Sequence, residues 1–285
     1  MNNQIKINCL GPAGSYGHEA ARLAVAKLEL TGAELDFQPT NTSILETVLR
    51  TIEAGSLGIV PVENSTAGDV VDVMAFLARQ PPASPLGIIG EIILPVRHCL
   101  LVPPGLNAVA ELQGIASHPQ AISQCGESIR RWGFTPAQIE PANSTAGAAK
   151  LVFEQPEKKM GALASAFAGA TYGLKTLEAD VQTRSDNATR FFVFGRKRLI
   201  APTGDDKSVI IFQTKNRPGA LLCALLPLGL LGVNLTAIHS VAQGGWSYSF
   251  YIETNAHAEN PRLRLALRAA RFFVKNLSIL GSFPK

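Results

Sequence analysis

The stretch Asn187-Ala188-Thr189-Arg190-Phe191-Phe192-Val193-Phe194 places a hydroxyl group and a fixed positive charge at the start of a run of aromatic and β-branched residues. Such a run is typical of a buried strand, and an isolated match would predict nothing more. However, arginine can bind a carboxylate with two parallel hydrogen bonds, and a threonine hydroxyl can donate to a departing oxygen. In company with other polar segments, the stretch therefore suits an anionic substrate that loses a hydroxyl group.

Three further polar segments interrupt apolar surroundings: Gly11 to Tyr16, Pro61 to Gly68 and Ser117 to Cys125. Each follows a short predicted strand, at 5–10, 57–60 and 114–116, and the first two precede predicted helices at 19–30 and 70–78. The start of a helix carries unpaired backbone N–H groups and the positive end of the helix dipole, which favour an anion. We therefore expect several such junctions to converge on one anionic ligand.

With these segments in place, the chain resembles prephenate dehydratase with a C-terminal ACT domain over nearly its whole length. The matching segments occur in the family's order: Gly11 to Ser15, Pro61 to Gly68, Ser117 to Cys125, Asn143 to Ala146, Tyr172 to Leu174 and Asn187 to Phe191. Thr-Arg-Phe and Glu-Asn-Ser are the specific elements, whereas glycine turns occur in many unrelated loops. The resemblance implies a carbon–oxygen lyase that converts prephenate to phenylpyruvate, with loss of water and carbon dioxide, in L-phenylalanine biosynthesis.

The resemblance also implies the domain organisation. Residues 1–200 are expected to form an α/β catalytic domain of two lobes, like a periplasmic binding protein, with the active site in the cleft between them. Lobe one is expected at about 1–78 plus 175–196, and lobe two at about 79–174. The chain would then cross a hinge twice.

A proline-rich stretch, 80–85, predicts a stiff break within this domain. After it, residues 91–102 are predicted to form a pair of strands that is interrupted at Pro95.

Residues 207–285 predict a second, α+β unit in the order βαββαβ, which is the ferredoxin-like plan of an ACT domain. The predicted strands are 207–214, 233–242, 246–253 and 277–283, and the predicted helices are 218–231 and 261–275. Residues 243–245 predict a hairpin turn, and Pro227 predicts a kink in the first helix. Trp246, Tyr248 and Phe250 are expected to form one packed face of a strand.

Composition limits the other function classes. The chain has 285 residues, 46% hydrophobic and 17% charged, which is enough for a sizeable core and two or three units. Its net charge is only +4 and its basic residues are scattered, so no nucleic-acid partner is expected. The spacing of its cysteines (Cys9, Cys99, Cys125 and Cys223) indicates reduced thiols rather than a zinc site. No membrane span or signal peptide is expected, and the protein is predicted to be cytoplasmic and without a cofactor.

The resemblance assigns the proton donor to Thr189. Arg190 is either a substrate ligand or a structural ion pair, and the second is favoured if Thr189 faces the cleft, because consecutive strand residues face opposite ways. The remaining expected substrate-binding residues are Asn64, Ser65, Ser117, Gln124, Ser15, Ser144, Thr145, Ser165 and Phe191. For Ser15, Ser65 and Ser144 the alternative is helix N-capping, which serine favours.

The chain departs from the family pattern at three places. Ser15-Tyr16-Gly17 lacks one hydroxyl of the family's first loop, Ala166 replaces a glutamate, and His239-Ser240-Val241-Ala242 replaces Glu-Ser-Arg-Pro. These changes leave two alternatives open: arogenate as the substrate, or a degenerate sensor of an amino acid or keto acid. A prephenate decarboxylase that keeps the hydroxyl is disfavoured, because Thr189 is retained.

An effector site is expected where the C-terminal helix begins, at Asn216, Pro218, Gly219, Ala220 and Leu221. A phenylalanine-like ligand fits this site, but the replaced segment 239–242 lacks the family's charged residues. We therefore expect weak or absent inhibition by L-phenylalanine. Because ACT domains commonly pair, a homodimer or homotetramer is expected.

Overall fold

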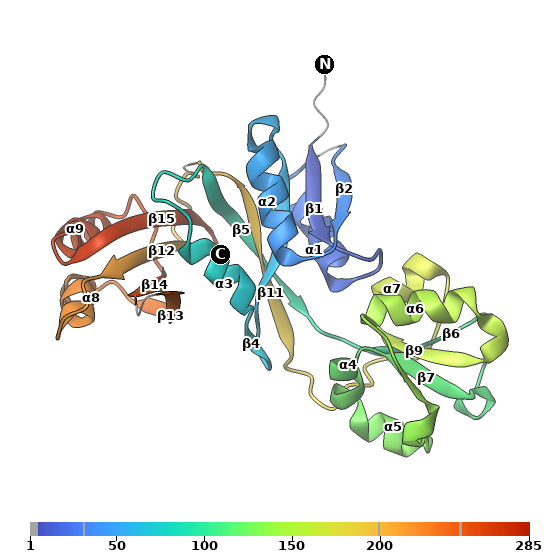
Figure 1. Ribbon diagram of the computed structural model, residues 1–285. Helices are drawn as coiled ribbons and strands as arrows, with labels where there is room; N and C mark the ends of the chain where they lie inside the picture. The colour runs from blue at the N-terminus through green and yellow to red at the C-terminus, as the bar shows by residue number, and fades with distance from the viewer. Residues whose placement is uncertain (1–4, 31, 199, 245–246) are drawn as a thin grey trace.

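The structure of the protein is a computed structural model (Figure 1). Its described residues form three β-sheets, each in a different part of the molecule. The structure describes residues 5–30, 32–198, 200–244 and 247–285. Within these ranges no helix is both long and apolar enough to cross a membrane. The mixed α/β architecture agrees with the sequence prediction.

The first sheet has the order β2-β1-β3-β11-β5, with the short β4 paired to β3. Its strands are β1 Lys6–Leu10, β2 Glu34–Gln38, β3 Leu57–Asn64, β4 Gly68–Asp69, β5 Leu86–Pro95 and β11 Ala188–Arg196. Its helices are α1 Tyr16–Lys27, α2 Asn41–Thr51 and α3 Val71–Ala78, with a 3₁₀ turn at Ile52–Ala54. β1, β2 and β3 are parallel, whereas β11 runs antiparallel between β3 and β5.

The second sheet has the order β10-β6-β9-β7-β8. Its strands are β6 Cys99–Val102, β7 Gly114–Ser117, β8 Ile139–Pro141, β9 Met160–Ala164 and β10 Lys175–Glu178. The helices are α4 Pro119–Gln124, α5 Gly126–Trp132, α6 Thr145–Glu154 and α7 Ala166–Tyr172, with 3₁₀ turns at Val109–Glu111, Pro136–Gln138 and Pro156–Lys158. One of the apolar clusters of this part contains several alanines of α6 and β9, which lets helix and sheet approach closely.

Sheet membership corrects the expected limits of the two lobes. β5 belongs to the first sheet, so that lobe extends to Pro95 and does not end near residue 78. β10 pairs with β6 in the second sheet, so the return to the first sheet begins with β11 at Ala188 and not at 175. The break at Pro95 is confirmed, but the strands on either side of it lie in different sheets and do not pair.

The segment Pro61 to Gly68 also differs from its prediction. It does not join a strand directly to a helix, because β3 continues to Asn64 and then turns back into β4, with Asn64 opposite Gly68. The helix α3 begins only after this hairpin, at Val71. The turn therefore holds Asn64 at the end of the sheet rather than at a helix N-terminus.

The C-terminal unit has the predicted order βαββαβ. Its elements are β12 Asp206–Thr214, α8 Ala220–Leu230, β13 Leu235–Gly244, β14 Ser247–Thr254, α9 Pro261–Ala270 and β15 Val274–Pro284. The antiparallel sheet has the order β13-β14-β12-β15. Helix α9 is shorter than predicted, because β15 begins at Val274 rather than Leu277. Trp246 lies outside the described residues, whereas Tyr248 is 45% exposed, so its ring does not form part of a fully packed face.

The C-terminal unit shares a core with the first sheet. One apolar cluster contains Ile44, Val60 and Phe192 of the N-terminal part together with Tyr251 and Phe283 of the C-terminal unit. The backbones also meet closely, because a methyl group added at Gly281 would overlap the Ile88 carbonyl of β5. The two units are therefore packed as one body along β5 and β15, as Figure 1 shows.

Candidate active site

A cavity of about 290 Å³ lies between the first and second sheets. Seven of the predicted residues line it: Ser15, Asn64, Gln124, Ser144, Thr145, Thr189 and Phe191. They come from α1, β3 and β11 on one side and from α4 and α6 on the other. The volume is near the lower end of the range for small-molecule sites. The expected convergence of the polar segments on one site is therefore observed.

The serines at the helix starts act as N-caps. Ser15 Oγ accepts from His18 N at 3.1 Å and donates to Leu10 O at 2.7 Å, so its only hydroxyl hydrogen is used within the protein. Ser144 Oγ accepts from Gly147 N at 2.9 Å. Among the described residues no acceptor is recorded for the Ser144 hydroxyl hydrogen, which leaves it available to a ligand.

Thr189 lies on β11 directly opposite Asn64 on β3. Asn64 Nδ2 donates to Thr189 Oγ1 at 3.0 Å and to Asn187 Oδ1 at 2.8 Å. Asn64 Oδ1 accepts from the backbone N–H groups of Thr66 and Ala67, which fixes the amide in this orientation. The hairpin therefore orients the Asn64 amide toward the Thr189 hydroxyl.

This arrangement assigns different roles to the two side chains. Because Thr189 Oγ1 accepts from Asn64, its own hydrogen is directed to another acceptor, and the cavity lies beside it. Both ends of the Asn64 amide are occupied by the protein, so Asn64 positions Thr189 rather than binding substrate directly. Asn187 accepts through its oxygen, which turns its two N–H donors toward ligand space.

Gln124 is oriented by a buried histidine. His98 is only 2% exposed, and its Nε2 lies 2.9 Å from Gln124 Oε1. Burial lowers the pKa of His98, so the ring is neutral near pH 7 and can donate from Nε2. The Gln124 oxygen is then occupied, and its NH₂ group is presented to the cavity. Tyr16 completes this corner, with its hydroxyl donating to Arg97 O at 2.7 Å and lying 3.3 Å from His98 Nδ1.

Arg190 points away from the cavity, as expected if Thr189 faces it. Its guanidinium lies 2.7 Å from both Glu63 and Glu253 and 3.6 Å from Glu91. Burial opposes the charge on Arg190, but the hydrogen bond and charge of Glu253 outweigh it and raise the pKa. The alternative that Arg190 binds substrate is therefore not supported.

Three other predicted residues do not line the cavity. Ser117 is fully buried and donates to Leu163 O at 2.6 Å, and Ser165 caps α7 through a bond from Ala168 N. Ser65 accepts from Ala188 N at 2.9 Å, which ties the hairpin to the start of β11. All three have structural roles beneath or beside the site.

The lining is polar, and its titratable side chains are Tyr16, His98 and His118. Within the described part of the chain, lysine, arginine, aspartate and glutamate are absent from the lining. The available donors are neutral: Asn187, Gln124, Ser144, Thr145 and Thr189. Among the same residues, no group of three or more His, Cys, Asp or Glu side chains is arranged to hold a metal ion.

Sequence reasoning missed several lining residues. His98 and Tyr16 were not predicted, and Asn143 and Asn187 were quoted only as parts of motifs. A signal existed for His98, because it directly precedes the apolar run 99–102. Its role depends on a neighbour 26 positions away, which no local pattern contains.

Comparison with known proteins identifies the family. The model of the family described as prephenate dehydratase matches residues 7–199. The chain belongs to the prephenate dehydratase family. This membership makes it a lyase, as the sequence predicts.

Relatives that match over the whole chain carry the same name or a related one. A bifunctional chorismate mutase/prephenate dehydratase of Aquifex aeolicus is 32% identical, over 100% of this chain and 75% of the relative. Arogenate dehydratase 2 of Petunia hybrida is 31% identical, over 99% of this chain and 72% of the relative. The prephenate dehydratase family thus includes relatives named for either substrate.

Two solved structures are similar over nearly the full chain. A prephenate dehydratase from Arthrobacter aurescens, solved in complex with L-Phe, has a TM-score of 0.85 and 28% identity, covering 99% of this chain and 90% of that one. A protein described as a novel type of quorum quenching acylase has a TM-score of 0.84 and 33% identity, covering 98% and 97%. The fold of this prephenate dehydratase family member is therefore shared with an enzyme described by another activity.

Proposed function

We propose that the protein converts prephenate to phenylpyruvate, with loss of carbon dioxide and water, as a step of L-phenylalanine biosynthesis. The observation that carries this proposal is the bond from Asn64 to Thr189 Oγ1, which leaves the threonine hydrogen for a leaving oxygen beside a cavity of neutral donors. Membership of the prephenate dehydratase family supports it independently.

The chemistry matches this donor set. In prephenate the ring C–O bond and the bond to the ring carboxylate both break, and the electron pair from the carboxylate completes an aromatic ring. The dianion and one proton become the phenylpyruvate anion, carbon dioxide and water. Aromatisation drives the reaction, so the site needs a donor for the leaving hydroxyl and donors for the retained carboxylate. Strong stabilisation of the departing carboxylate would slow the step.

Thr189 acts mainly by electrostatic stabilisation in this scheme. A threonine hydroxyl is a weak acid, but its hydrogen bond strengthens as negative charge develops on the leaving oxygen. Asn64 donates to Thr189 Oγ1 and so supports the polarisation of the threonine hydroxyl. Gln124 and Asn187 supply amide donors for the retained carboxylate.

A single ultraviolet assay tests the proposal. Purified protein is mixed with prephenate, and phenylpyruvate is measured, with Thr189→Ala as the control for contaminating activity. Formation of phenylpyruvate by the unchanged protein alone is expected. Faster formation of L-phenylalanine from arogenate would assign the alternative substrate. Binding without product from either substrate would favour the sensor and contradict the proposal.

The domain organisation is proposed on the same basis. Residues 1–200 are a catalytic domain of two lobes like a periplasmic binding protein, and residues 207–285 are an ACT domain. The position of the cavity between two sheets and the βαββαβ order support this division. The two crossings of the chain between the sheets then form the hinge.

We also propose L-phenylalanine as an effector of the C-terminal unit. A second cavity, of about 390 Å³, is lined by Asn216, Gly219, Ala220 and Leu221, but Pro218 is not part of the lining. Lys215, Arg217 and Lys275 add positive charge suited to a carboxylate, and Phe250 adds an aromatic surface. The related Arthrobacter protein, solved with L-Phe, supports this ligand.

The sequence argument against coupling rested on the charged residues missing from segment 239–242, but other contacts link the C-terminal unit to the first sheet. His239 Nδ1 lies 2.6 Å from Asp69 Oδ2 on β4, next to the hairpin that holds Asn64. Glu253 and Lys207 of the C-terminal unit join Arg190 and Glu91 in one buried network. Arg190 is the immediate neighbour of Thr189, so a shift of the C-terminal unit reaches the catalytic strand directly.

L-phenylalanine is therefore expected to lower the initial rate with prephenate, in place of the weak or absent inhibition predicted from sequence. Glu253→Gln keeps the shape of the network but removes its central charge. In calorimetry this variant is expected to bind L-phenylalanine with unchanged affinity. Inhibition of its rate with prephenate is expected to be about fivefold weaker, or weaker still, than that of the unchanged protein. Glu53→Gln, at an exposed pair with Arg196, is the matched control. Equal inhibition of all three proteins would contradict this coupling route.

Acylase activity is a second candidate function, and its support is the similarity to one solved structure. Acyl transfer through a side chain needs a nucleophile beside a base. Among the described residues no serine, threonine or cysteine side chain is recorded in a hydrogen bond with a histidine ring, and burial raises the pKa of Cys125 to about 12. These observations favour the dehydratase.

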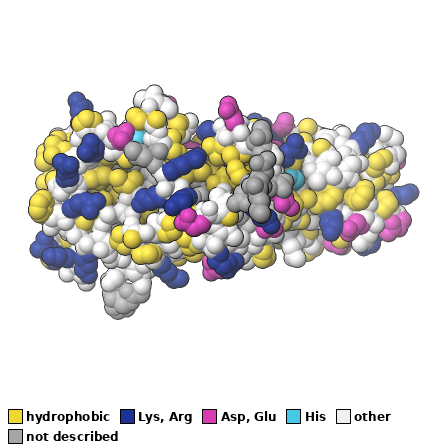
Figure 2. All heavy atoms as spheres, turned by 90° about the horizontal axis from the view of Figure 1, so that it is seen from above, with side chains coloured by type: hydrophobic (Ala, Val, Ile, Leu, Met, Phe, Trp, Pro, Cys, Tyr) yellow, Lys and Arg dark blue, Asp and Glu magenta, His cyan; other side chains and the backbone are white. Residues whose placement is uncertain are grey.

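A cytoplasmic homodimer or homotetramer is proposed for the assembled protein. Leu222, Leu226 and Leu230 recur every four residues along α8 and are each at least half exposed, which suits a subunit contact. Lysine and arginine side chains on the same end of the molecule are interspersed with apolar atoms and form no continuous stripe in the view from above (Figure 2). This distribution suits a protein contact better than a nucleic acid.

A further inference from the structure

The cavity leaves a charge unaccounted for if the substrate is the dianion proposed above. Its described lining contains no lysine or arginine, and Arg190, the cation of the Thr-Arg-Phe motif, is paired with Glu63 and Glu253 on the opposite face of β11. The retained carboxylate, on the flexible side chain of the substrate, meets the neutral amides of Gln124 and Asn187, and its charge calls for a positive partner close by.

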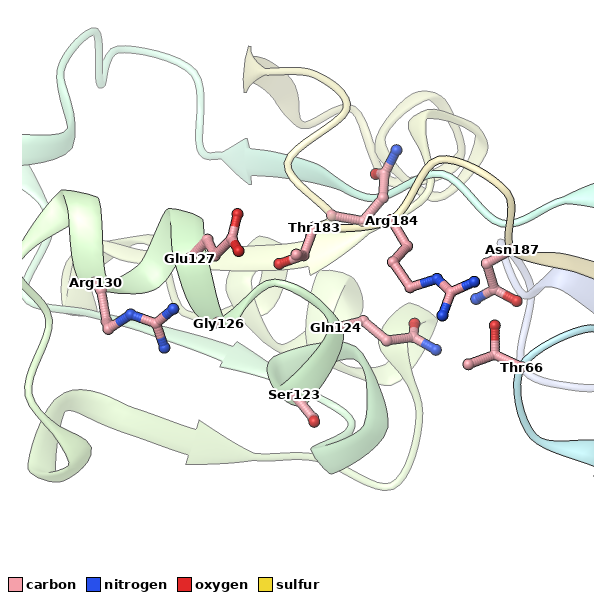
Figure 3. Close-up of a pocket in the computed structure, with 10 residues that line it drawn as sticks. Thr66, Ser123, Gln124, Gly126, Glu127, Arg130, Thr183, Arg184 and Asn187 are labelled. Atoms are coloured by element: carbon pink, nitrogen blue, oxygen red, sulfur yellow. The ribbon is translucent and has the colours of Figure 1, made fainter.

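Another pocket, of about 380 Å³, adjoins the reaction cavity and shares Gln124 and Asn187 with it. Its other lining residues include Thr66, Thr183 and Arg184. Figure 3 shows the Arg184 guanidinium extending toward Asn187 and Thr66, with Gln124 on the other side of the opening. Two arginines line this pocket, Arg130 and Arg184, and Figure 3 shows Arg184 as the one that extends toward the amides shared with the reaction cavity.

The present partner of Arg184 is easily exchanged. Arg184 Nε and Nη2 lie 3.0 and 2.7 Å from the two oxygens of Asp186, in a two-pronged contact. The side chains are 67% and 65% exposed, and an ion pair in water is weak and readily replaced. A substrate carboxylate has the same planar geometry as Asp186, so it can take this position on the guanidinium fork.

We propose that Arg184 is the specificity-determining residue that binds the side-chain carboxylate of the substrate, an α-keto or α-amino acid group, with Asp186 holding the arginine ready before substrate enters. This inference rests on the proposed function. It leaves the ring carboxylate without an arginine partner. That separation favours the reaction, because an arginine on the departing carboxylate would stabilise the ground state and slow its loss.

The test compares Arg184→Gln and Arg184→Lys with Arg196→Gln, a matched control whose exposed pair with Glu53 is 2.8 Å long and remote from both pockets. Arg184→Gln is expected to raise KM for prephenate by about 10- to 100-fold with little change in kcat, because it removes a charge-assisted contact that is present before and during reaction. The KM of Arg184→Lys should lie between those of Arg184→Gln and the unchanged protein, and the KM of Arg196→Gln should equal that of the unchanged protein.

Binding of phenylpyruvate supplies a readout that does not require turnover, because phenylpyruvate carries the same side-chain carboxylate. In calorimetry, Arg184→Gln is expected to weaken its binding by a similar factor, and added salt should weaken binding to the unchanged protein more than to the variant. If prephenate is not converted, the proposed function fails, and the calorimetry still decides the role of Arg184. Equal affinity of Arg184→Gln and Arg196→Gln, or no binding to any of the proteins, would overturn the inference.

Discussion

Replacing Thr189 by valine is expected to lower kcat for prephenate by about two to four orders of magnitude, the range for loss of a positioned proton donor. Valine has nearly the same shape, so the strand should pack as before between β3 and β5. Only the hydroxyl that accepts from Asn64 and faces the cavity is lost. Single-turnover kinetics and thermal unfolding of the same preparation measure the two effects separately.

Thr189→Ser is the matched control, because serine keeps the hydroxyl and loses only a methyl group. It should retain most of the activity, and both variants should bind phenylpyruvate as the unchanged protein does. A Thr189→Val protein with more than a tenth of the unchanged turnover would remove Thr189 from the catalytic role.

Asn64→Ala is expected to lower kcat/KM by about 30- to 1000-fold, which corresponds to about 2 to 4 kcal/mol of transition-state stabilisation. The variant removes the donor to Thr189 and also the acceptor for the Thr66 and Ala67 N–H groups. Because Asn64 positions Thr189 and does not itself hold substrate, the decrease should be mainly in kcat.

Asn64→Asp separates these two losses. Aspartate keeps an acceptor for the turn but cannot donate to Thr189, so the turn should stay folded while kcat remains low. Recovery of normal kcat in Asn64→Asp would show that the turn matters and the polarisation of Thr189 does not. Combination with Thr189→Val gives a cycle in which the two effects should not add.

The fold could be predicted where local patterns are strong. The order βαββαβ follows from periodicity and turn residues within about 80 positions, and it is observed. The lobe limits could not be predicted, because β5 and β11 join the same sheet across more than 90 intervening residues. The sequence of an apolar strand does not indicate which sheet the strand will join.

The candidate site could also be predicted only in part. Motifs brought Thr189, Asn64 and Gln124 to one cavity, since each belongs to a polar segment beside a predicted strand. Sequence did not separate residues that face ligand from those that hold them in place. The roles of Asn64 and His98 depend on partners 125 and 26 positions away, so they follow only from the tertiary fold.

The shared core between the first sheet and the C-terminal unit also has a consequence for how the protein is made. Phe283 packs in the same cluster as Ile44 and Val60, although more than 220 positions separate it from both. A nascent chain therefore cannot complete the apolar core beside the first sheet until β15 has left the ribosome. Translation products that stop before β15 will expose an apolar face, which makes them substrates for chaperones and proteases rather than free-standing enzymes.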